Sequence, residues 1–335
     1  MNSTEAIDDP LVFDTFFRPQ VWGGRGLQSQ LGRTLPCELP YGEAWELGSL
    51  PLHESRVLEG KNAGRPLADL WTKSRQGLTG GTGRDVFPLL IKWLECRELL
   101  SLQVHPDDAM AQRLLNEPYG KSEAWVIVSV EPTARIYAGL KPGVTRDDFV
   151  SHLRSRTLEE CLHSFVPQPG DCISIPAGTI HAAGGGLIIA EVQQSSDATF
   201  RLYDWNRMGL DGKPRPLQVE KAMDAINWQQ GPNSPVVPKV IPSDISGLRG
   251  ESLVDGVGFR MERYFVEHAC PTPNSGEFTV WMVLEGNAVL TNAATGYERG
   301  FQKGSTFVIP SCLDQTMLKS KDESCLLTLL CVRLT

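Results

Sequence analysis

Short apolar runs that end at glycine or proline recur along most of this chain, and they constrain its fold more than any other feature. The sequence holds 32 glycines and 23 prolines among 335 residues. Turn residues at this frequency leave little room for long helices and favour many short strands. Strand patterns fill 86–105, 123–138 and 170–205, and they dominate again after residue 243. The expected fold class is therefore all-β with minor helices.

Helical spacing is limited to three stretches, at 66–73, 108–117 and 145–165. Asp107 directly precedes the second stretch and is expected to cap its N-terminus. The third stretch begins at Thr145 and carries acidic residues in the first turn after it, which suits the helix dipole. These helices are short pieces between strands and do not change the expected fold class.

Two β-patterns occur twice in the chain. The matched segments are EAWVIV (123–128) with TVWMVL (279–284), and PQPGDCISIPAGTIHA (167–182) with GFQKGSTFVIPSCLDQTM (300–317). In this alignment Glu123 corresponds to Thr279 and His181 to Gln315, so the second copy has lost its polar positions. Either the chain contains two copies of one β-unit, or short strand-and-turn patterns match by chance.

Charge and composition limit the kinds of molecule that this protein is expected to bind. The net charge of −8 argues against nucleic acid or an anionic membrane as the main partner. It does not exclude a phosphorylated substrate, because a local cluster of Lys and Arg decides that. The first ten residues lack the features of a signal peptide, and no apolar run reaches transmembrane length. Eight cysteines are scattered without a CxxC pair, as expected for free thiols in the cytoplasm.

The stretch SLQVHPDD, residues 101–108, places two metal-capable side chains on one strand face. Gln103 and His105 are two residues apart, so they project from the same face, roughly 7 Å apart along the strand. Pro106 cannot continue a central ladder and ends the strand. Polar side chains at a strand end can reach a cavity without placing charge in the core. Alone, the pattern more often marks an ordinary surface or core histidine.

Two further candidates lie downstream, and the four together offer one amide oxygen, one carboxylate and two imidazoles. Glu123 opens a tryptophan-containing strand, where a solvated strand start is the simpler interpretation. His181 lies in IPAGTIHAAGGG after a tight turn and could equally be a core histidine. As a set, the four residues suit Zn²⁺, with Mn²⁺, Fe²⁺ or Co²⁺ as alternatives. Without a cysteine cage, such a site is expected to be open and catalytic.

The order of these motifs resembles type I mannose-6-phosphate isomerase, in the short bacterial form of that family within the cupin superfamily. The resemblance covers roughly 10–225 and rests on LLIKWLECRELLSLQVHPDD, GKSEAW, PAGTIHAAGGG and EVQQSSDATFRLYDWNR, with VWGG and YGEAWELGS nearer the N-terminus. It implies two cupin-like jelly-roll barrels, with a metal site, usually zinc, formed by the four candidates in the N-terminal barrel. Some members carry a histidine directly before the lysine of the glutamate motif, where this chain has Gly120.

The implied reaction interconverts mannose 6-phosphate and fructose 6-phosphate through an enediol. It needs a base, positive charge near the developing enediolate, and a basic phosphate anchor. A bound metal supplies part of that charge as a Lewis acid. The catalytic candidates are Lys92, Lys121, Glu191, Asp197 and Arg201, and the substrate-binding candidates are Ser101, Lys92 and Lys121.

A local feature of the sequence supports each of the substrate-binding candidates. Lys92 lies inside the apolar strand LLIKW, so it should face a cavity or an acid, because an unpaired buried lysine is costly. Lys121 lies two residues before Glu123 and would share its face if that segment were extended. Ser101 shares the face of Gln103 and could hydrogen-bond the phosphate.

The other catalytic candidates follow His181 in the chain. Arg201 stays protonated at neutral pH, so we assign it to positioning and charge stabilisation. Proton movement then falls to a metal-bound water, Asp197 or Glu191. Glu191 and Gln193 alternate on one strand face and could point toward the cavity of His181. The competing interpretation is that Arg201 and Asp197 form a structural ion pair.

Two other functions are open on the sequence alone: an Fe²⁺-dependent cupin oxygenase and a non-catalytic sugar-binding cupin. The oxygenase class often has two histidines separated by one residue, and Gln103 replaces the first of them here. Basic residues around an otherwise complete site argue against a protein that only binds sugar.

A Pro-rich polar stretch, QQGPNSPVVPKVIPS at 229–243, separates the two repeat copies. We expect a catalytic metal-binding domain at 1–230, a linker or chain crossing at 231–245, and a degenerate cupin-like domain without metal ligands at 246–335. The expected partner is a small sugar phosphate, with neither nucleic acid nor membrane. The sequence carries no signal for a particular oligomeric state.

Overall fold

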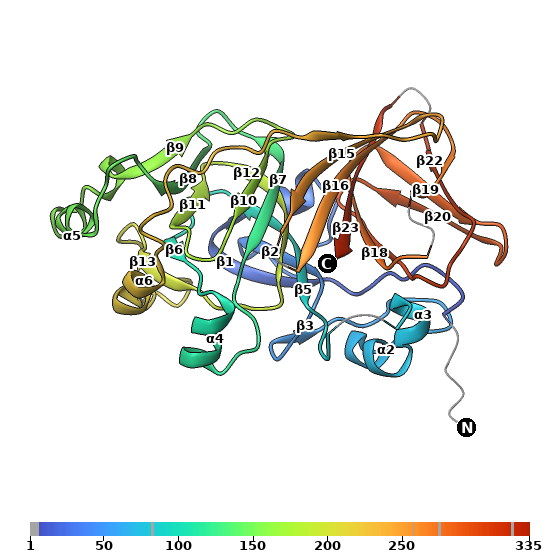
Figure 1. Cartoon of the computed structure of the whole chain (residues 1–335), viewed down its shortest axis with the longest axis horizontal. Helices are drawn as coiled ribbons and strands as arrows, with labels where there is room; N and C mark the ends of the chain where they lie inside the picture. The colour runs from blue at the N-terminus through green and yellow to red at the C-terminus, as the bar shows by residue number, and fades with distance from the viewer. Residues whose placement is uncertain (1–6, 82–83, 257, 274–275, 323–324) are drawn as a thin grey trace.

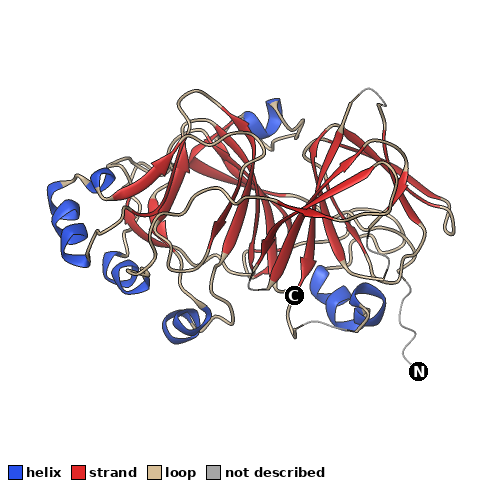
Figure 2. Cartoon of the chain, turned by 45° about the horizontal axis from the view of Figure 1, so that its top comes forward, coloured by secondary structure: helices blue, strands red, loops and turns tan. Residues whose placement is uncertain are grey.

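Strands are the main regular structure of the described chain, as the turn-rich sequence predicts, and short helices lie around them (Figure 1, Figure 2). The computed structural model describes residues 7–81, 84–256, 258–273, 276–322 and 325–335. The helices are α1 (Gly26–Ser29), α2 (Leu67–Lys73), α3 (Arg75–Thr79), α4 (Asp108–Leu115), α5 (Arg146–Ser155) and α6 (Val219–Ala225), with a 3₁₀ turn at Leu158–Glu160. None of these described helices is long and apolar enough to cross a membrane.

Two antiparallel sheets form the N-terminal part of the molecule. The six-stranded sheet has the order β1 (Phe16–Gly24), β2 (Tyr41–Leu47), β5 (Leu89–Cys96), β12 (Leu187–Gln194), β7 (Glu123–Val130) and β10 (Cys172–Ile175). The five-stranded sheet has the order β13 (Phe200–Tyr203), β6 (Leu102–Val104), β11 (His181–Gly184), β8 (Arg135–Leu140) and β9 (Leu162–Phe165). A small hairpin pairs β3 (Ser49–Leu50) with β4 (His53–Glu54).

Two more sheets form the C-terminal part. One has the order β14 (Lys239–Ile241), β15 (Leu248–Asp255), β16 (Phe259–Val266), β23 (Leu327–Leu334), β18 (Thr279–Glu285) and β21 (Thr306–Ile309). The other has the order β17 (Cys270–Pro271), β22 (Thr316–Ser320), β19 (Asn287–Asn292) and β20 (Tyr297–Gln302).

The two six-stranded sheets repeat one another in strand order and register. Strand β10 pairs with β7 so that Ile175 lies opposite Glu123, and β21 pairs with β18 so that Ile309 lies opposite Thr279. The paired residues occupy equivalent positions in the two aligned sequence copies. Matching of order and register together favours two copies of one β-unit over a chance match of short patterns.

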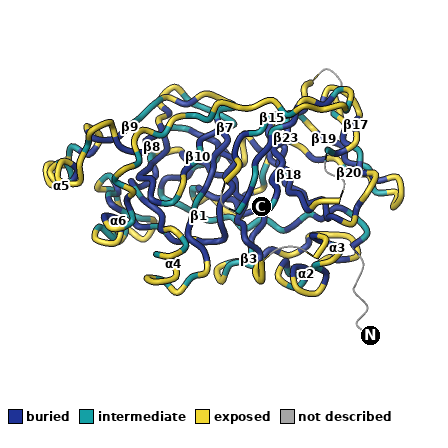
Figure 3. The backbone as a smooth tube through the Cα atoms, in the orientation of Figure 1, coloured by how far each residue is buried: buried dark blue, intermediate teal, exposed yellow. Residues whose placement is uncertain are grey.

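Both six-stranded sheets contribute to one hydrophobic core, which appears as the buried centre of the molecule (Figure 3). Leu89 and Val126 from the first sheet belong to the same cluster as Val280 and Val332 from the second. The N-terminal segment adds to this contact, because Leu11 forms a β-bridge with Val308. Burial of apolar surface between the two parts stabilises both of them.

The helix ends follow local capping chemistry, with one difference from the sequence prediction. Thr145 and Asp148 form a reciprocal capping box at the start of α5. The helix does not continue to residue 165, because Arg156 adopts a left-handed conformation with φ of 62° and ends it. The remainder forms the 3₁₀ turn and then β9, whose backbone pairs with β8.

The side chain of Asp107 caps α4 by accepting a hydrogen bond from the Met110 N–H at 2.7 Å, as predicted. Replacing Asp107 with alanine should lower the free energy of unfolding by about 1 kcal/mol, because one N-terminal N–H loses its acceptor. Thermal and urea unfolding would measure this loss, with Gln112→Ala on the same helix as control. Equal stability of the two variants would contradict the capping role.

Candidate metal centre and substrate pocket

Three polar side chains lie in one row across the five-stranded sheet. Gln103 on β6 has His181 on β11 opposite it on one side and Arg201 on β13 on the other. Residues opposite one another in a sheet project from the same face, so the three side chains point the same way. His105 follows directly after β6 and is fully buried.

A second row lies across the six-stranded sheet. Lys92 on β5 is opposite Glu191 on β12, which in turn is opposite Trp125 on β7. Glu123 is two residues before Trp125 on the same strand and therefore shares this face. Contact between Glu123 and His181 shows that the two rows face one another across the interior.

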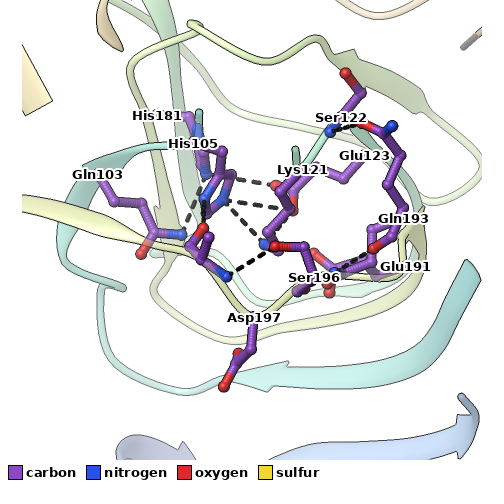
Figure 4. Close-up of polar contacts among 12 residues, drawn as sticks. Gln103, His105, Lys121, Ser122, Glu123, His181, Glu191, Gln193, Ser196 and Asp197 are labelled. Carbon is purple, nitrogen blue, oxygen red and sulfur yellow. Dashed lines mark hydrogen bonds and ion pairs between the residues drawn. The ribbon is translucent and has the colours of Figure 1, made fainter. Parts of the chain in front are cut away.

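His105, Glu123 and His181 form a compact buried cluster, whose candidate ligand atoms all lie within 4.8 Å of one another (Figure 4). His105 Nε2 lies 3.5 Å from Glu123 Oε2, and His181 Nε2 lies 3.4 Å from Glu123 Oε1. The structure thus brings together three of the four predicted ligands, from positions up to 76 residues apart in the chain.

Backbone carbonyls set the orientation of both rings. His105 Nδ1 lies 2.8 Å from the Ala198 carbonyl oxygen, and His181 Nδ1 lies 2.9 Å from that of Thr179. Each Nδ1–H therefore donates outward, and each Nε2 lone pair faces the cluster. Burial lowers the pKa of His181 to about 4, and burial together with Lys121 holds the pKa of His105 well below its usual range. Both rings are neutral, as metal ligands must be.

The cluster has the properties of a site that could hold a divalent cation. Glu123 Oε1 is buried and accepts no hydrogen bond from the described residues. Burial raises the pKa of Glu123 to about 8, against the opposing effect of Lys121. One carboxyl group and two imidazole Nε2 atoms directed at one another in a buried site form a donor set that fits a divalent metal ion.

Gln103 lies beside the cluster as the fourth predicted ligand. Its Nε2 is 3.2 Å from His181 Nε2, and its Oε1 is 3.2 Å from the Ser101 hydroxyl. Rotation of the amide would direct the oxygen toward the His181 imidazole, and the amide nitrogen could then donate to Ser101. The residue is therefore within reach of the cluster.

Lys121 is held against the ligands by the chain around it. Its Nζ lies 2.5 Å from Glu123 Oε2 and 2.9 Å from His105 Nε2. The preceding Gly120 donates its N–H to Asp108 Oδ1 at 2.8 Å. A Cβ at Gly120 would lie 2.4 Å from the Asp107 carbonyl carbon and 2.5 Å from the Pro106 carbonyl oxygen, so no side chain fits there. A histidine at this position is incompatible with this backbone.

Lys92 is shared between two buried carboxylates. Its Nζ lies 3.1 Å from Glu191 Oε2 and 3.5 Å from Glu43 Oε2. Burial alone would lower the pKa of Lys92, but these two acids outweigh it and raise the pKa. Burial would likewise raise the pKa of Glu191, but Lys92 and Lys121 lower it to about 2. At neutral pH the pocket wall therefore carries a fixed ammonium and a fixed carboxylate.

Arg201 and Asp197 lie at the same pocket but do not pair with each other. Arg201 donates through Nε to Ser101 Oγ at 3.1 Å and through Nη1 to the Pro216 carbonyl at 2.9 Å. Asp197 instead accepts from Arg18 Nη1, at 3.1 and 3.2 Å. Its carboxylate points away from the two histidines (Figure 4). The structural ion pair between Arg201 and Asp197 that the sequence left open is therefore not formed.

A pocket of about 310 Å³ opens beside the cluster. The predicted residues that line it are Lys92, Ser101, Gln103, Lys121, Glu191, Asp197 and Arg201. The sequence prediction missed other lining residues: Arg18, Gln20, Trp22, Glu43, Thr199 and Arg215. Strand alternation suggested that Gln193 could point toward this cavity, but its amide donates to the carbonyls of Gln194 and Ser196, and it does not line the pocket.

Period-two alternation could have found some of the missed residues. Arg18, Gln20 and Trp22 alternate along β1, and Glu43 shares a face of β2 with Trp45. Trp45 donates its indole N–H to Glu43 at 2.7 Å, so a buried carboxylate with a fixed partner is present in the motif YGEAWELGS. Arg215 lies in a loop with no such pattern.

The fold and the site define a mostly β-strand protein with a buried His–Glu–His cluster that could hold a metal beside a polar pocket. Residues 11–128 match the family model of the phosphomannose isomerase type I catalytic domain. The chain is 31% identical over 315 residues to mannose-6-phosphate isomerase ManA of Bacillus subtilis, covering 94% of this chain and 97% of that protein. It is 30% identical over 316 residues to the putative mannose-6-phosphate isomerase YvyI of the same organism, covering 92% and 96%.

A solved structure agrees with these matches. The crystal structure of mannose 6-phosphate isomerase from Bacillus subtilis superposes with a TM-score of 0.88 at 28% identity, covering 97% of this chain and 100% of that one. The chain belongs to the type I phosphomannose isomerase family.

Proposed function

We propose that this protein is a metal-dependent aldose–ketose isomerase that interconverts mannose 6-phosphate and fructose 6-phosphate. The observation that carries the proposal is the buried His105–Glu123–His181 cluster beside a pocket with cationic side chains, in a chain of this family. The names of the relatives, which are mannose-6-phosphate isomerases, support mannose 6-phosphate as a substrate. A pocket of about 310 Å³ has the size for a small sugar phosphate.

We assign Gln103, His105, Glu123 and His181 as the ligands of one divalent metal, with zinc first and Mn²⁺, Fe²⁺ or Co²⁺ as alternatives. Nitrogen and oxygen donors without a thiolate support this choice. The bound metal would supply Lewis-acid stabilisation of negative charge on the substrate oxygens.

The remaining pocket residues divide by charge. Lys92, Lys121 and Arg201 would surround the enediolate and the phosphate with positive charge, with Ser101 adding a hydroxyl. Glu191 lies on the pocket wall opposite Lys92, and this position supports it as the group that accepts the proton from the substrate carbon.

Asp197 was the other proton carrier predicted from the sequence. Its carboxylate points away from the cluster and is bound to Arg18 (Figure 4). We therefore propose Glu191 ahead of Asp197 for proton movement between C1 and C2.

We further propose that the sheets form two cupin-like barrels, with the metal in the N-terminal one. The repeated strand order and register support this architecture. The division into 1–230, 231–245 and 246–335 stays a prediction, with the second unit lacking ligands where Thr279 and Gln315 replace Glu123 and His181. All eight cysteines are free, which supports a cytoplasmic location.

A coupled assay for conversion of mannose 6-phosphate to fructose 6-phosphate, with and without a chelator, tests the function. We expect turnover that the chelator abolishes and added Zn²⁺ restores, because the ligands hold the metal only through N and O donors. Well-folded, metal-loaded protein without turnover would overturn the isomerase proposal. Oxygen uptake with a sugar substrate would favour the oxygenase, and phosphate-sugar binding without turnover would favour a binding protein.

A further inference from the structure

An ion pair joins the two facing sheets at the edge of the pocket. Arg18 on β1 contacts Asp197, which precedes β13, through Nη1 at 3.1 Å to Oδ2 and 3.2 Å to Oδ1. The Arg18 side chain is 24% exposed and that of Asp197 is 44% exposed. Both residues line the pocket, so a ligand that enters it meets this pair.

Other contacts fix the position of the Arg18 guanidinium, but some of its N–H groups form no hydrogen bond with the described residues. Its guanidinium lies 4.8 Å from the centre of the Trp45 ring, and Nη1 is also 3.5 Å from Glu43. Among the described residues, all of its hydrogen bonds leave from Nη1. A guanidinium has five N–H donors, so Nε and Nη2 are free to bind an anion.

Asp197 is the carboxylate that a ligand can displace most readily. The other acids of the pocket wall, Glu43 and Glu191, are buried and bound to Lys92. Asp197 is half-exposed, and an exposed ion pair contributes little to stability. Loss of its partner would leave Asp197 hydrated and would not bury an uncompensated charge.

The opposite wall has an excess of positive charge. Arg207 and Arg215 both bind Asp204, at 2.8 Å and 2.6 Å, so two guanidiniums share one carboxylate. Arg201 forms no ion pair with an acid in the part of the chain that the structure describes, and burial together with the neighbouring Arg215 lowers its pKa. A phosphate between Arg18 and Arg201 would therefore relieve repulsion on this side.

We propose that Arg18 is a phosphate-binding residue that determines specificity for phosphorylated sugars, and that Asp197 is its exchangeable counter-ion in the free protein. This inference rests on the proposed function, because it concerns the same pocket. A phosphate monoester carries up to two charges and three acceptor oxygens, so it competes for the guanidinium against a single carboxylate. An unphosphorylated sugar has no group that can make this exchange.

Calorimetric binding of inorganic phosphate to the full-length protein at low salt tests the exchange without turnover. Arg18→Gln should weaken phosphate binding about 10- to 100-fold, because a charge-assisted contact is lost. Asp197→Asn should tighten binding about 2- to 5-fold, because a competing acid is removed. The double variant should match Arg18→Gln, since Asp197 acts only through Arg18.

Arg97→Gln is the matched control, since Arg97 Nη1 contacts both oxygens of Glu131 at 2.7 Å in an exposed pair outside the pocket. It should leave phosphate binding unchanged. Unchanged affinity in folded Arg18→Gln, or weaker binding in Asp197→Asn, would overturn the inference. Arg18→Lys, which keeps the charge, should bind phosphate with intermediate affinity.

A second readout uses substrate selectivity. The ratio of kcat/KM for mannose 6-phosphate to that for mannose should fall in Arg18→Gln, with the change in KM larger than the change in kcat. An equal loss on both sugars would contradict a role in phosphate recognition. Should the protein lack isomerase turnover altogether, the phosphate titrations still decide the role of Arg18.

Discussion

Replacing His181 with alanine is expected to remove the metal and to lower kcat/KM by about 10³-fold or more, because Lewis-acid stabilisation of the substrate oxygens is lost with it. The His181 side chain is fully buried, and its Nε2 faces Glu123 at 3.4 Å. The remaining donors cannot replace it, since the described residues near the cluster offer no further imidazole or thiolate. Metal analysis of the purified variant and the coupled assay measure the two effects.

His163→Ala is the control for this variant. His163 lies on β9 and contacts Ser234 at the surface, outside the pocket. It should retain both metal and activity. Stoichiometric zinc in folded His181→Ala would show that the ligand assignment is wrong, whatever the activity.

Replacing Lys121 with methionine is expected to separate metal binding from catalysis. The ammonium lies 2.5 Å from Glu123 and 2.9 Å from His105, so it competes with a cation for the same lone pairs. Its removal should leave metal affinity equal or higher. The same change removes a positive charge from the pocket wall, and kcat should fall about 10²- to 10³-fold.

Lys303→Met is the corresponding control, because Lys303 also pairs with a carboxylate, Glu285, at 2.6 Å, but lies in the C-terminal part. It should behave like the unchanged protein in both measurements. Loss of metal from folded Lys121→Met would assign Lys121 to support of the ligands, and unchanged kcat would remove it from the catalytic set.

Local patterns predicted those parts of the site that depend on neighbours in the chain. Gln103 and His105 follow from strand alternation and from Pro106, and Asp107 follows from the chemistry of a helix start. The correspondence between the two repeat copies followed from aligned tryptophans and Ile-Pro pairs, because side-chain period and turn position together define a β-unit. These signals lie within short windows of sequence.

The rest depends on which strands become neighbours. Arg18 and Asp197 are 179 residues apart, and their contact arises only because β1 and the loop before β13 meet at the pocket edge. The two ion pairs of Lys92, with Glu43 and with Glu191, likewise form only because β5 lies between β2 and β12 in the sheet. No local pattern encodes such distant partners. The end of α5 was missed because Arg156, a helix-favouring residue type, ends it in a left-handed conformation.

The core that both six-stranded sheets share affects how inactive variants should be interpreted. Val280 and Val332, far from any ligand in the sequence, pack in the same cluster as Leu89 and Val126. A random screen for loss of activity would therefore recover substitutions in both halves of the chain, because a lower folded fraction reduces the amount of enzyme in the cell. The turnover rate per folded molecule would be normal in these variants and lower in variants that alter the chemistry, so measuring it separates the two groups.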